Sequence, residues 1–418
     1  MEQQHKIERA VLAGLAADCF RPEEQATERS LDELEALLET AGGSCVAKVL
    51  QTRHTPDPHS FVGQGKAEEI RDLAQNNDAN LVVFDNDLSP SQIRAMEEIT
   101  GATVLDRSAL ILDIFAQRAQ TAEGRLQVEL AQYQYLLPRL SGMGNSMSRL
   151  GGGIGTRGPG ETKLETDRRY IRTRIHALKE ELETVRRNRA VERSRRLKNE
   201  IPVVALVGYT NSGKSTLLNA LTGASIPANN RLFDTLDTTT RQLKVSDSLT
   251  VLLSDTVGFI AKLPHNLIDA FQATLEELSY ADLLIHVIDA SDPERDDHMK
   301  VVRRLIDQLA KPGTPVIECF NKADLVSSSE MLLGTNLVAI SAKKGENLDD
   351  LLLLIERQLS RLRHRVRLLL PYSMGGQIDV LHQKAEVLSC EYQADGIAVE
   401  AIVDETLYGK LKAYIVSE

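Results

Sequence analysis

The chain has 418 residues, of which 42% are hydrophobic and 26% charged, with a formal net charge of −11 and no tryptophan. This length allows about two to four domains. No apolar run approaches the ~18–20 residues of a membrane span, and the N-terminus lacks the pattern of a signal peptide, so we expect a cytoplasmic location. The four cysteines, Cys19, Cys45, Cys319 and Cys390, form no metal-ligand spacing and are expected to be inert thiols.

Residues 1–110 alternate short β-branched runs with helical patterns, which predicts a small N-terminal α/β domain. The expected strands are Val46–Leu50, Leu81–Asp85 and Thr103–Leu105. The expected helices include Ser30–Thr40 and Lys66–Asn76.

Residues 111–200 predict a helical hairpin. The first helix has Leu126, Leu130, Tyr133 and Leu137 on one face, and the second repeats Leu164, Ile171, Ile175, Leu178, Leu182 and Val185 at steps of three and four. Between them, Ser141–Gly160 contains eight glycines in twenty residues, and each would cost a helix about 1 kcal/mol relative to alanine. We therefore expect two antiparallel helices with a glycine-rich loop at the tip.

The charge is unevenly distributed, because Arg139–Glu200 holds sixteen Lys and Arg against eight Asp and Glu. This segment carries +8, which leaves −19 for the rest of the chain. A basic arm on an acidic body is suited to binding RNA phosphates. The alternative is a solvated helix face whose acids and bases pair within the helix.

Residues 201–363 predict a doubly wound, mainly parallel sheet, since each apolar strand is followed by a helical segment. The expected strands are Val203–Val207, Val251–Leu253, Leu283–Ile288, Val316–Phe320 and Val338–Ile340, and the expected last helix is Asn347–Leu362. Residues 364–418 predict a small C-terminal α/β domain. The fold class is α/β.

The segment GYTNSGKS follows the first of these strands and precedes a helical pattern, as in a P-loop. Backbone N–H groups would surround the phosphates, Lys214 would neutralise phosphate oxygens, and the Ser215 hydroxyl would bind Mg²⁺. The residues expected at the phosphates are Gly208, Tyr209, Thr210, Asn211, Ser212, Gly213, Lys214, Ser215 and Thr216.

A second motif, DTVG, comprises Asp255, Thr256, Val257 and Gly258. We expect Asp255 to hold Mg²⁺ through water and the Gly258 amide to contact the γ-phosphate. The next residue is Phe259, where many Ras-like proteins have a glutamine that positions the attacking water. Intrinsic hydrolysis is therefore expected to be slow.

Two motifs indicate guanine recognition. The first comprises Asn321, Lys322, Ala323 and Asp324, and the second comprises Ser341, Ala342 and Lys343. The Asp324 carboxylate can accept two hydrogen bonds from guanine, whereas adenine offers no such donor pair, and the Ala342 amide would contact guanine O6. Four motifs in this order predict a Ras-like P-loop GTPase domain that binds GTP or GDP with Mg²⁺, and they disfavour a metabolic P-loop kinase.

A threonine must supply a second hydroxyl to Mg²⁺ from the first switch, the segment NNRLFDTLDTTTR. This segment resembles the F-x-T-L-D pattern of Obg- and HflX-type GTPases, which aligns Thr235 with the metal ligand; Thr238, Thr239 and Thr240 are alternatives. The residues expected near the nucleotide here are Phe233, Asp234, Thr235, Leu236 and Asp237. Asn211 resembles the residue of GTPases that bind K⁺ beside the phosphates, although it could instead only brace the loop.

The stretches Gly151–Arg169 and Asp255–Glu277, together with the order of domains, closely resemble the HflX family of ribosome-associated GTPases. The resemblance covers nearly the whole chain and is weakest in its last 55 residues. It implies a GTP hydrolase in which Lys214, Thr235 and Gly258 act at the γ-phosphate. One departure is Asp234, where the family more often has a small residue.

The resemblance implies binding to the large (50S) ribosomal subunit and the 70S ribosome, stimulation of hydrolysis by ribosomes, and GTP-dependent dissociation of stalled or idle ribosomes under stress. The basic hairpin would contact rRNA, and its tip would reach ~30–50 Å toward the peptidyl-transferase region. The alternative is a ribosome-assembly or RNA-remodelling GTPase. We expect a monomer. Relatives are credited with ATP binding by the N-terminal region, but Phe61–Lys66 (FVGQGK) lacks a P-loop spacing and favours a turn before a helix.

Overall fold

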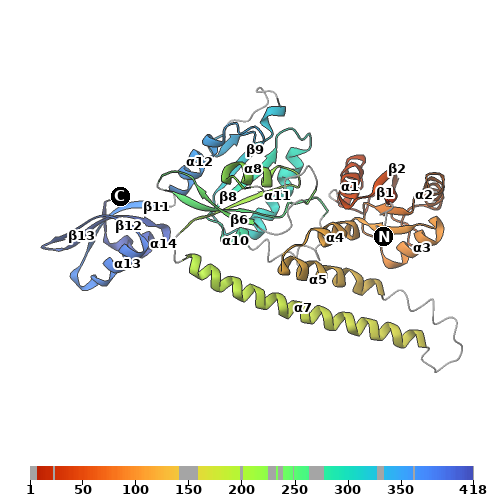
Figure 1. Ribbon diagram of the computed structural model, residues 1–418, viewed down its shortest axis with the longest axis horizontal. Coiled ribbons are helices and arrows are strands. Elements are labelled where there is room, and N and C mark those ends of the chain that lie inside the picture. Colours follow the sequence, from red (N-terminus) through yellow and green to blue (C-terminus); the bar gives the residue numbers. More distant parts are fainter. Residues whose placement is uncertain are drawn as a thin grey trace, which may run out of the picture.

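The computed structural model describes residues 7–21, 24–140, 159–197, 201–224, 232–233, 239–247, 249–262, 277–326, 334–360 and 363–417. It contains three sheets of four, six and four strands. Figure 1 shows three α/β units in a row, with a pair of long helices running beneath the N-terminal and central units. This arrangement confirms the predicted fold class.

The N-terminal domain has a parallel sheet in the order β2-β1-β3-β4. Its strands are β1 Arg9–Ala17, β2 Ser44–Arg53, β3 Leu81–Phe84 and β4 Thr103–Asp106. Its helices are α1 Glu28–Ala41, α2 Gln64–Asn76, α3 Pro90–Thr100 and α4 Arg107–Arg118. The sequence did not predict β1, a central strand, because its residues RAVLAGLAA favour a helix.

Local signals in the sequence fix where these helices begin. Thr27 and Ser89 each form a capping box at the start of α1 and α3. The FVGQGK segment precedes α2, with Phe61 in the left-handed region at φ 66° and Gly63 at the N-cap. This is the turn before a helix that the sequence favoured.

Helices α5, Ala122–Arg139, and α7, Pro159–Leu197, form the predicted antiparallel hairpin (Figure 1). Leu178 and Leu182 of α7 are 0% and 7% exposed and pack on Leu126, Leu130 and Tyr133 of α5. The 39 residues of α7 make it about 58 Å long. Residues 141–158 of the predicted tip loop lie outside the described residues. No described helix combines the length and the apolar character needed to cross a membrane.

The central domain has a sheet in the order β10-β9-β8-β5-β7-β6, parallel except for the pairing of β6 with β7. Its strands are β5 Val203–Gly208, β6 Thr239–Lys244, β7 Thr250–Asp255, β8 Leu283–Asp289, β9 Val316–Asn321 and β10 Leu337–Ala339. Its helices are α8 Lys214–Thr222, α10 Glu277–Tyr280, α11 Arg295–Leu309 and α12 Leu348–Ser360, with a 3₁₀ turn, η4, at Ala323–Leu325. The sequence predicted the parallel strands but not β6, whose residues TTRQLK are mostly polar.

The C-terminal domain has an antiparallel sheet in the order β12-β13-β11-β14. Its strands are β11 Arg363–Leu370, β12 Glu386–Gln393, β13 Gly396–Asp404 and β14 Ile415–Ser417, and its helices are α13 Gly376–Lys384 and α14 Glu405–Leu411. Its core, which includes Val366, Leu368 and Val399, is a cluster separate from the others.

By contrast, the N-terminal and central domains share one continuous apolar core. Residues of α1, α4 and β1 lie in the same cluster as residues of β5, β8 and α11. Within it, the Phe115 ring of α4 meets the Phe233 ring edge-on, with centroids 4.7 Å apart. The two domains therefore pack against each other as one body.

Candidate functional site

The phosphate loop, defined as Gly208–Ser215, joins the end of β5 to the start of α8. Asn211 and Gly213 take left-handed conformations, with φ of 60° and 92°. A Cβ on Gly208 would lie 2.3 Å from a carbonyl oxygen of β8, and one on Gly213 would lie 2.2 Å from Nδ2 of Asn321. Both positions therefore require glycine. The loop leads into a helix N-terminus, whose N–H groups favour an anion.

Lys214 is buried within this loop and is only 6% exposed. Its Nζ donates to the carbonyl oxygens of Gly208 at 3.1 Å and Tyr209 at 2.9 Å. Desolvation lowers the pKa of Lys214 to about 8, partly offset by the charge of Asp255. At neutral pH the ammonium group is still mostly charged, so it can neutralise a phosphate.

Ser215 and Asp255 form the candidate magnesium site. The Ser215 hydroxyl donates to Oδ2 of Asp255 at 2.8 Å, and Asp255 is fully buried at the end of β7. The neighbouring Thr256 hydroxyl donates to the Leu206 carbonyl at 2.7 Å, which holds the strand end in place. Hydroxyl and carboxylate oxygens suit Mg²⁺, which takes few protein ligands together with substrate phosphates. Across the described residues, no group of three His, Cys, Asp or Glu side chains could hold a metal by itself.

The switch segment, defined as Gly258–Lys262, lies directly on the phosphate loop. The Thr210 N–H donates to the Phe259 carbonyl at 2.7 Å, and the Phe259 N–H donates to the Gly208 carbonyl at 3.1 Å. The Phe259 ring is 2% exposed and packs in the shared apolar core. An aromatic ring in this position cannot hydrogen-bond to water.

The first switch is only partly described. Asp234, Thr235, Leu236, Asp237 and Thr238 lie outside the described residues.

Phe233 is described; it is 2% exposed and contacts α4. Of the alternative metal ligands, Thr240 shares a hydrogen bond with Ser254 at 3.1 Å, so its hydroxyl is already engaged within the β6–β7 pair. Thr239 lies opposite Asp255 in the β6–β7 ladder, beside the candidate magnesium site.

Asn321 connects three of the predicted motifs. Its side-chain Nδ2 donates to the Ser212 carbonyl at 2.9 Å, and its Oδ1 accepts from the Ala342 N–H at 3.0 Å. Asn321 is 3% exposed. The phosphate loop and the two loops predicted to read the base are therefore held together by one buried amide.

Asp324 lies at the 3₁₀ turn that follows β9. The hydrogen bond from Ser341 lowers the pKa of the Asp324 carboxyl group, and Lys344, whose Nζ is 3.3 Å away, adds to this effect. Asp324 is therefore an ionised acceptor at neutral pH. The neighbouring Lys322 has a φ of 61° and pairs with Asp289 at 2.6 Å. Ala323 donates its N–H to the Ile340 carbonyl, and Lys343 is exposed.

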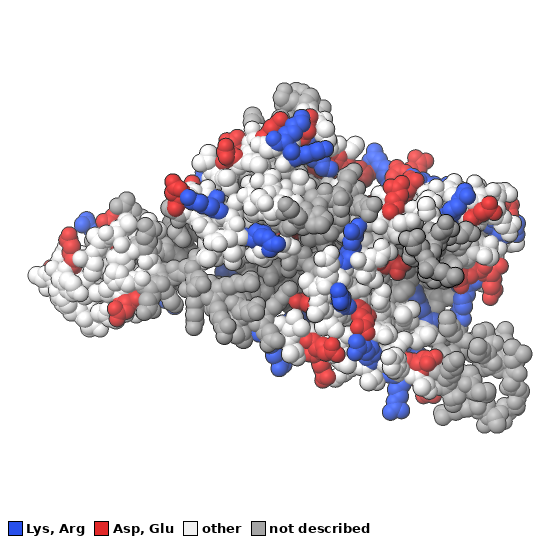
Figure 2. All heavy atoms as spheres, in the orientation of Figure 1, with Lys and Arg blue, Asp and Glu red and all other residues white. Residues whose placement is uncertain are grey.

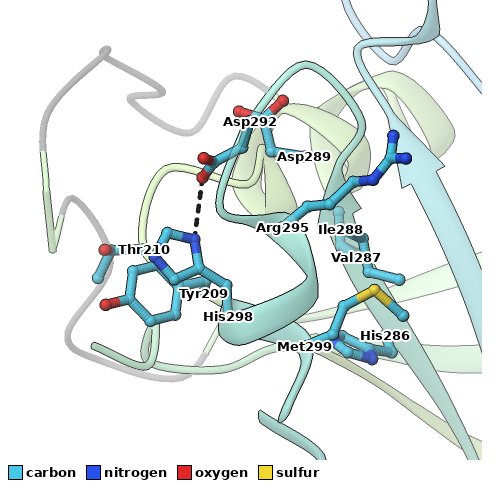
Figure 3. A pocket seen from close by; sticks show the side chains of 10 residues that line it. All are labelled: Tyr209, Thr210, His286, Val287, Ile288, Asp289, Asp292, Arg295, His298 and Met299. Atoms are coloured by element: carbon cyan, nitrogen blue, oxygen red, sulfur yellow. Dashed lines mark ion pairs between the residues drawn. The ribbon is translucent and has the colours of Figure 1, made fainter. Parts of the chain in front are cut away.

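Behind the phosphate loop, a cavity of about 20 Å³ lies between Tyr209 and α11, room for a single water. Figure 3 shows the His298 ring stacked on Tyr209, and the centroids are 3.6 Å apart. His298 Nδ1 lies 2.9 Å from the Asp292 carboxylate (Figure 3). His286 lines the same cavity, and burial lowers its pKa to about 3, so it is neutral. The cavity is too small for a base or a sugar.

Sequence reasoning missed the residues that join the N-terminal domain to this site. Glu33, Asp85 and Arg107 of the N-terminal domain contact Tyr209 and the switch segment. These residues belong to no motif. Glu33 and Tyr209 are 176 residues apart in the sequence, so no local pattern could have predicted their contact. Lys344, the partner of Asp324, was also missed, although it directly follows the last motif.

Acids and bases are mixed on the described part of the hairpin. Arg174 of α7 pairs with Glu129 of α5 at 2.9 Å, and Arg187 pairs with Glu183 one turn away at 3.7 Å. Figure 2 shows Lys and Arg interspersed with Asp and Glu along this side of the molecule. The larger excess of bases lies between Arg189 and Lys198, whose side chains are outside the described set.

Three protein-family models match the chain. A model described as GTP-binding GTPase N-terminal matches residues 28–116, and GTP-binding GTPase Middle Region matches residues 118–196. A third, described as 50S ribosome-binding GTPase, matches residues 203–322, which contain the phosphate loop, the switch segment and Asn321.

Curated relatives match over nearly the whole chain. GTPase HflX of Caldanaerobacter subterraneus subsp. tengcongensis is 46% identical, covering 98% of this chain and 94% of its own length. GTPase HflX of Lacrimispora saccharolytica is 47% identical, covering 97% and 95%. A crystal structure of SsGBP in complex with GDP covers 85% of this chain and 99% of its own, with 24% identity and a TM-score of 0.49.

Proposed function

Because the chain belongs to the HflX family of GTPases, we propose that it hydrolyses GTP on the large ribosomal subunit and thereby dissociates stalled or idle 70S ribosomes under stress. The chain is a GTP hydrolase by its family and domain content. The observation that carries the ribosomal part is the match of residues 203–322 to a 50S ribosome-binding GTPase.

The proposed nucleotide site uses the residues gathered around the phosphate loop. Lys214 holds the β- and γ-phosphates, the Gly258 amide contacts the γ-phosphate, and Asp324 reads the guanine edge. Ser215 and Thr235 bind Mg²⁺ directly, and Asp255 binds it through water. When bound, Mg²⁺ neutralises charge on the phosphate oxygens. The Ser215–Asp255 hydrogen bond at 2.8 Å supports this placement.

The proposed hydrolysis is slow without a ribosome, because the buried Phe259 ring cannot orient water. Adding saturating large subunits should raise the single-turnover rate of GTP hydrolysis by about tenfold or more, because slow intrinsic turnover is useful only if the target completes the site. Unchanged turnover would count against ribosomal activation.

Asn211 is the proposed K⁺ ligand, and its left-handed backbone places it at the turn of the phosphate loop. If K⁺ assists hydrolysis, single-turnover rates should be higher in KCl than in NaCl at equal ionic strength. Equal rates would leave Asn211 as a residue that braces the loop.

The helical hairpin is proposed to bind rRNA through its excess of bases, with the tip loop entering the peptidyl-transferase region. Arg139 and Pro159, which bound that loop, lie at the ends of two helices that pack together. Replacing residues 145–158 with a Gly/Ser linker of equal length should preserve nucleotide binding and most salt-sensitive ribosome affinity but impair splitting. Full splitting activity would show that the loop is a connector only.

Sedimentation of 70S ribosomes with the protein and GTP or a non-hydrolysable analogue tests the central proposal. Conversion of 70S particles to separate subunits is the expected result. Binding without conversion would instead favour an assembly or RNA-remodelling GTPase.

A further inference from the structure

A buried group of charges joins the N-terminal domain to the switch segment. Arg107, at the start of α4, is 1% exposed; its Nη1 donates to Asp85 at 2.8 Å, and its Nη2 pairs with Glu33. The same Nη2 donates to the Ala261 carbonyl of the switch segment at 3.3 Å. Lys262, the next residue, pairs its Nζ with Asp85.

Tyr209 of the phosphate loop completes this group. Its hydroxyl donates to Glu33 at 2.5 Å and accepts from the Ala261 N–H at 2.7 Å. Lys262 has a φ of 57°, which is uncommon for a residue other than glycine and needs surrounding contacts to hold it. Ala261 and Lys262 are therefore held by both the phosphate loop and the N-terminal domain.

Lys262 contacts the N-terminal domain at an unusual position. Asp85 directly follows β3, and the strand order reverses between β1 and β3. In doubly wound sheets, the crevice at such a reversal, outside the carboxyl ends of the strands, is where ligands bind. Here Asp85 instead binds Lys262 of the switch segment, so the two domains meet where such a domain usually holds a ligand.

This conformation leaves little room at the γ-phosphate position. A Cβ on Gly258 would lie 3.1 Å from Nζ of Lys214 and 3.0 Å from Cα of Thr210. A methyl group there would be in tight contact with both neighbours, which would have to give by a few tenths of an ångström. A γ-phosphate that contacts both Lys214 and the Gly258 amide is larger, so the switch segment must move away to admit it.

We propose that Tyr209 and Lys262 determine the preference between GDP and GTP: anchored by Glu33 and Asp85, they hold the switch segment against the phosphate loop and so disfavour the γ-phosphate. GDP needs no such movement and binds without breaking these contacts. The inference rests on the phosphate site at Gly208–Ser215 and is independent of the proposed ribosome splitting.

Two variants of the full chain test this. Tyr209→Phe removes one oxygen and keeps the ring that stacks on His298. Lys262→Met keeps the length of the side chain, and Asp85 retains Arg107 and the Ser30 hydroxyl as partners. Affinities for GDP and for a non-hydrolysable GTP analogue are measured by fluorescence titration. Each variant should raise the ratio of analogue affinity to GDP affinity roughly fivefold, the factor that corresponds to one ordinary hydrogen bond. Lys262→Met, which lies outside the phosphate loop, should change GDP affinity by less than about twofold.

The control is Arg29→Ala, which breaks an exposed ion pair with Glu294 at 3.0 Å between the same two domains without touching the switch segment. It should leave both affinities unchanged. Thermal unfolding in the presence of GDP shows whether each variant is folded. If one of the two variants does not fold, the affinities of the other variant test the proposal. An unchanged ratio of analogue to GDP affinity in the folded variants, or an equal shift for both nucleotides, would overturn the proposal.

Discussion

The surroundings of single residues set the charge that they present to the nucleotide. Lys214 and Asp324 were both predicted from motifs. The pKa of each is lowered in the folded protein, but by different causes. Desolvation lowers the pKa of Lys214 to about 8, which brings its titration close to neutral pH. The hydrogen bond from Ser341 lowers the pKa of Asp324, which keeps that carboxylate ionised.

We predict that nucleotide affinity falls as pH rises above about 8. A bound phosphate raises the pKa of Lys214, because a nearby negative charge favours the ammonium form. Between the free and bound pKa values the complex holds more protons than the free protein, so affinity falls by up to about tenfold per pH unit. Below about pH 7 lysine is protonated in both states and affinity should be level. Titration with fluorescent GDP measures the slope, and Lys214→Arg, which stays charged, should lose it.

We predict that Asp324→Asn shifts preference from guanine to xanthine nucleotides. The amide reverses one donor–acceptor pairing with the base edge, and a site built for a hydrogen bond rejects the wrong partner strongly. GTP affinity should fall by about 100-fold or more, while xanthosine triphosphate gains. Competition between the two triphosphates measures this, and a parallel loss of both would mean that Asp324 serves the loop rather than the base.

Single residues also mark the limit of sequence reasoning. The motifs predicted the phosphate loop itself, because a strand, a loop and a helix N-terminus impose their spacing, but not its contact with Glu33. They did not predict that Asn321 would bond to both Ser212 and the Ala342 amide. That role depends on strands far apart in the sequence meeting at one sheet edge.

Among the elements, the strand–loop–helix unit from β5 to α8 depends on glycines for two different reasons. Gly213 and Gly223 flank α8, and both have a positive φ, 92° and 67°. Only Gly213 also lies against another loop, since a Cβ there would be 2.2 Å from Asn321.

We predict that Gly213→Ala abolishes nucleotide binding, whereas Gly223→Ala does not. Both substitutions strain the backbone by a similar amount, about 1 kcal/mol. Only the first also drives Asn321 away from the phosphate loop. Titration with GDP should show a loss of about 100-fold or more for Gly213→Ala. Equal affinity in the two variants would mean that the Asn321 contact is dispensable.

Elements with a strong period were predictable, and those without one were not. The α5–α7 hairpin followed from apolar steps of three and four, and Leu178 is fully buried where that pattern placed it. The strands β1 and β6 were missed because alanine and leucine favour a helix and polar residues favour a loop. Both become strands because a neighbouring strand offers hydrogen bonds, which is a tertiary effect.

At the scale of the whole molecule, the apolar cores define fewer independent units than the domains predicted from the sequence. The sequence motifs suggested separate domains before and after residue 200, but one apolar core runs through both. The C-terminal domain keeps a core of its own.

We predict two unfolding transitions in calorimetry. The N-terminal and central domains should unfold together, and GDP should raise the temperature of that transition only. At 100 times its Kd, GDP should stabilise these two domains by about 2.7 kcal/mol. The C-terminal domain should unfold separately at a temperature that GDP does not change. Truncation after Ser360 provides the control, because it should remove that transition alone. Three transitions, with GDP shifting one of them, would show that the shared core does not couple the domains.

The shared core also has a consequence for synthesis. Glu33 and Tyr209 are 176 residues apart, so at ~5–20 residues per second the nascent chain needs roughly 9–35 seconds to make the second after the first. Strands β1 to β4 are complete early in that interval, while Phe115 and the buried charge of Arg107 still lack their partners from the central domain. During translation the first domain therefore presents an apolar, charged face to solvent until the switch segment emerges to cover it, the kind of exposed surface that chaperones protect.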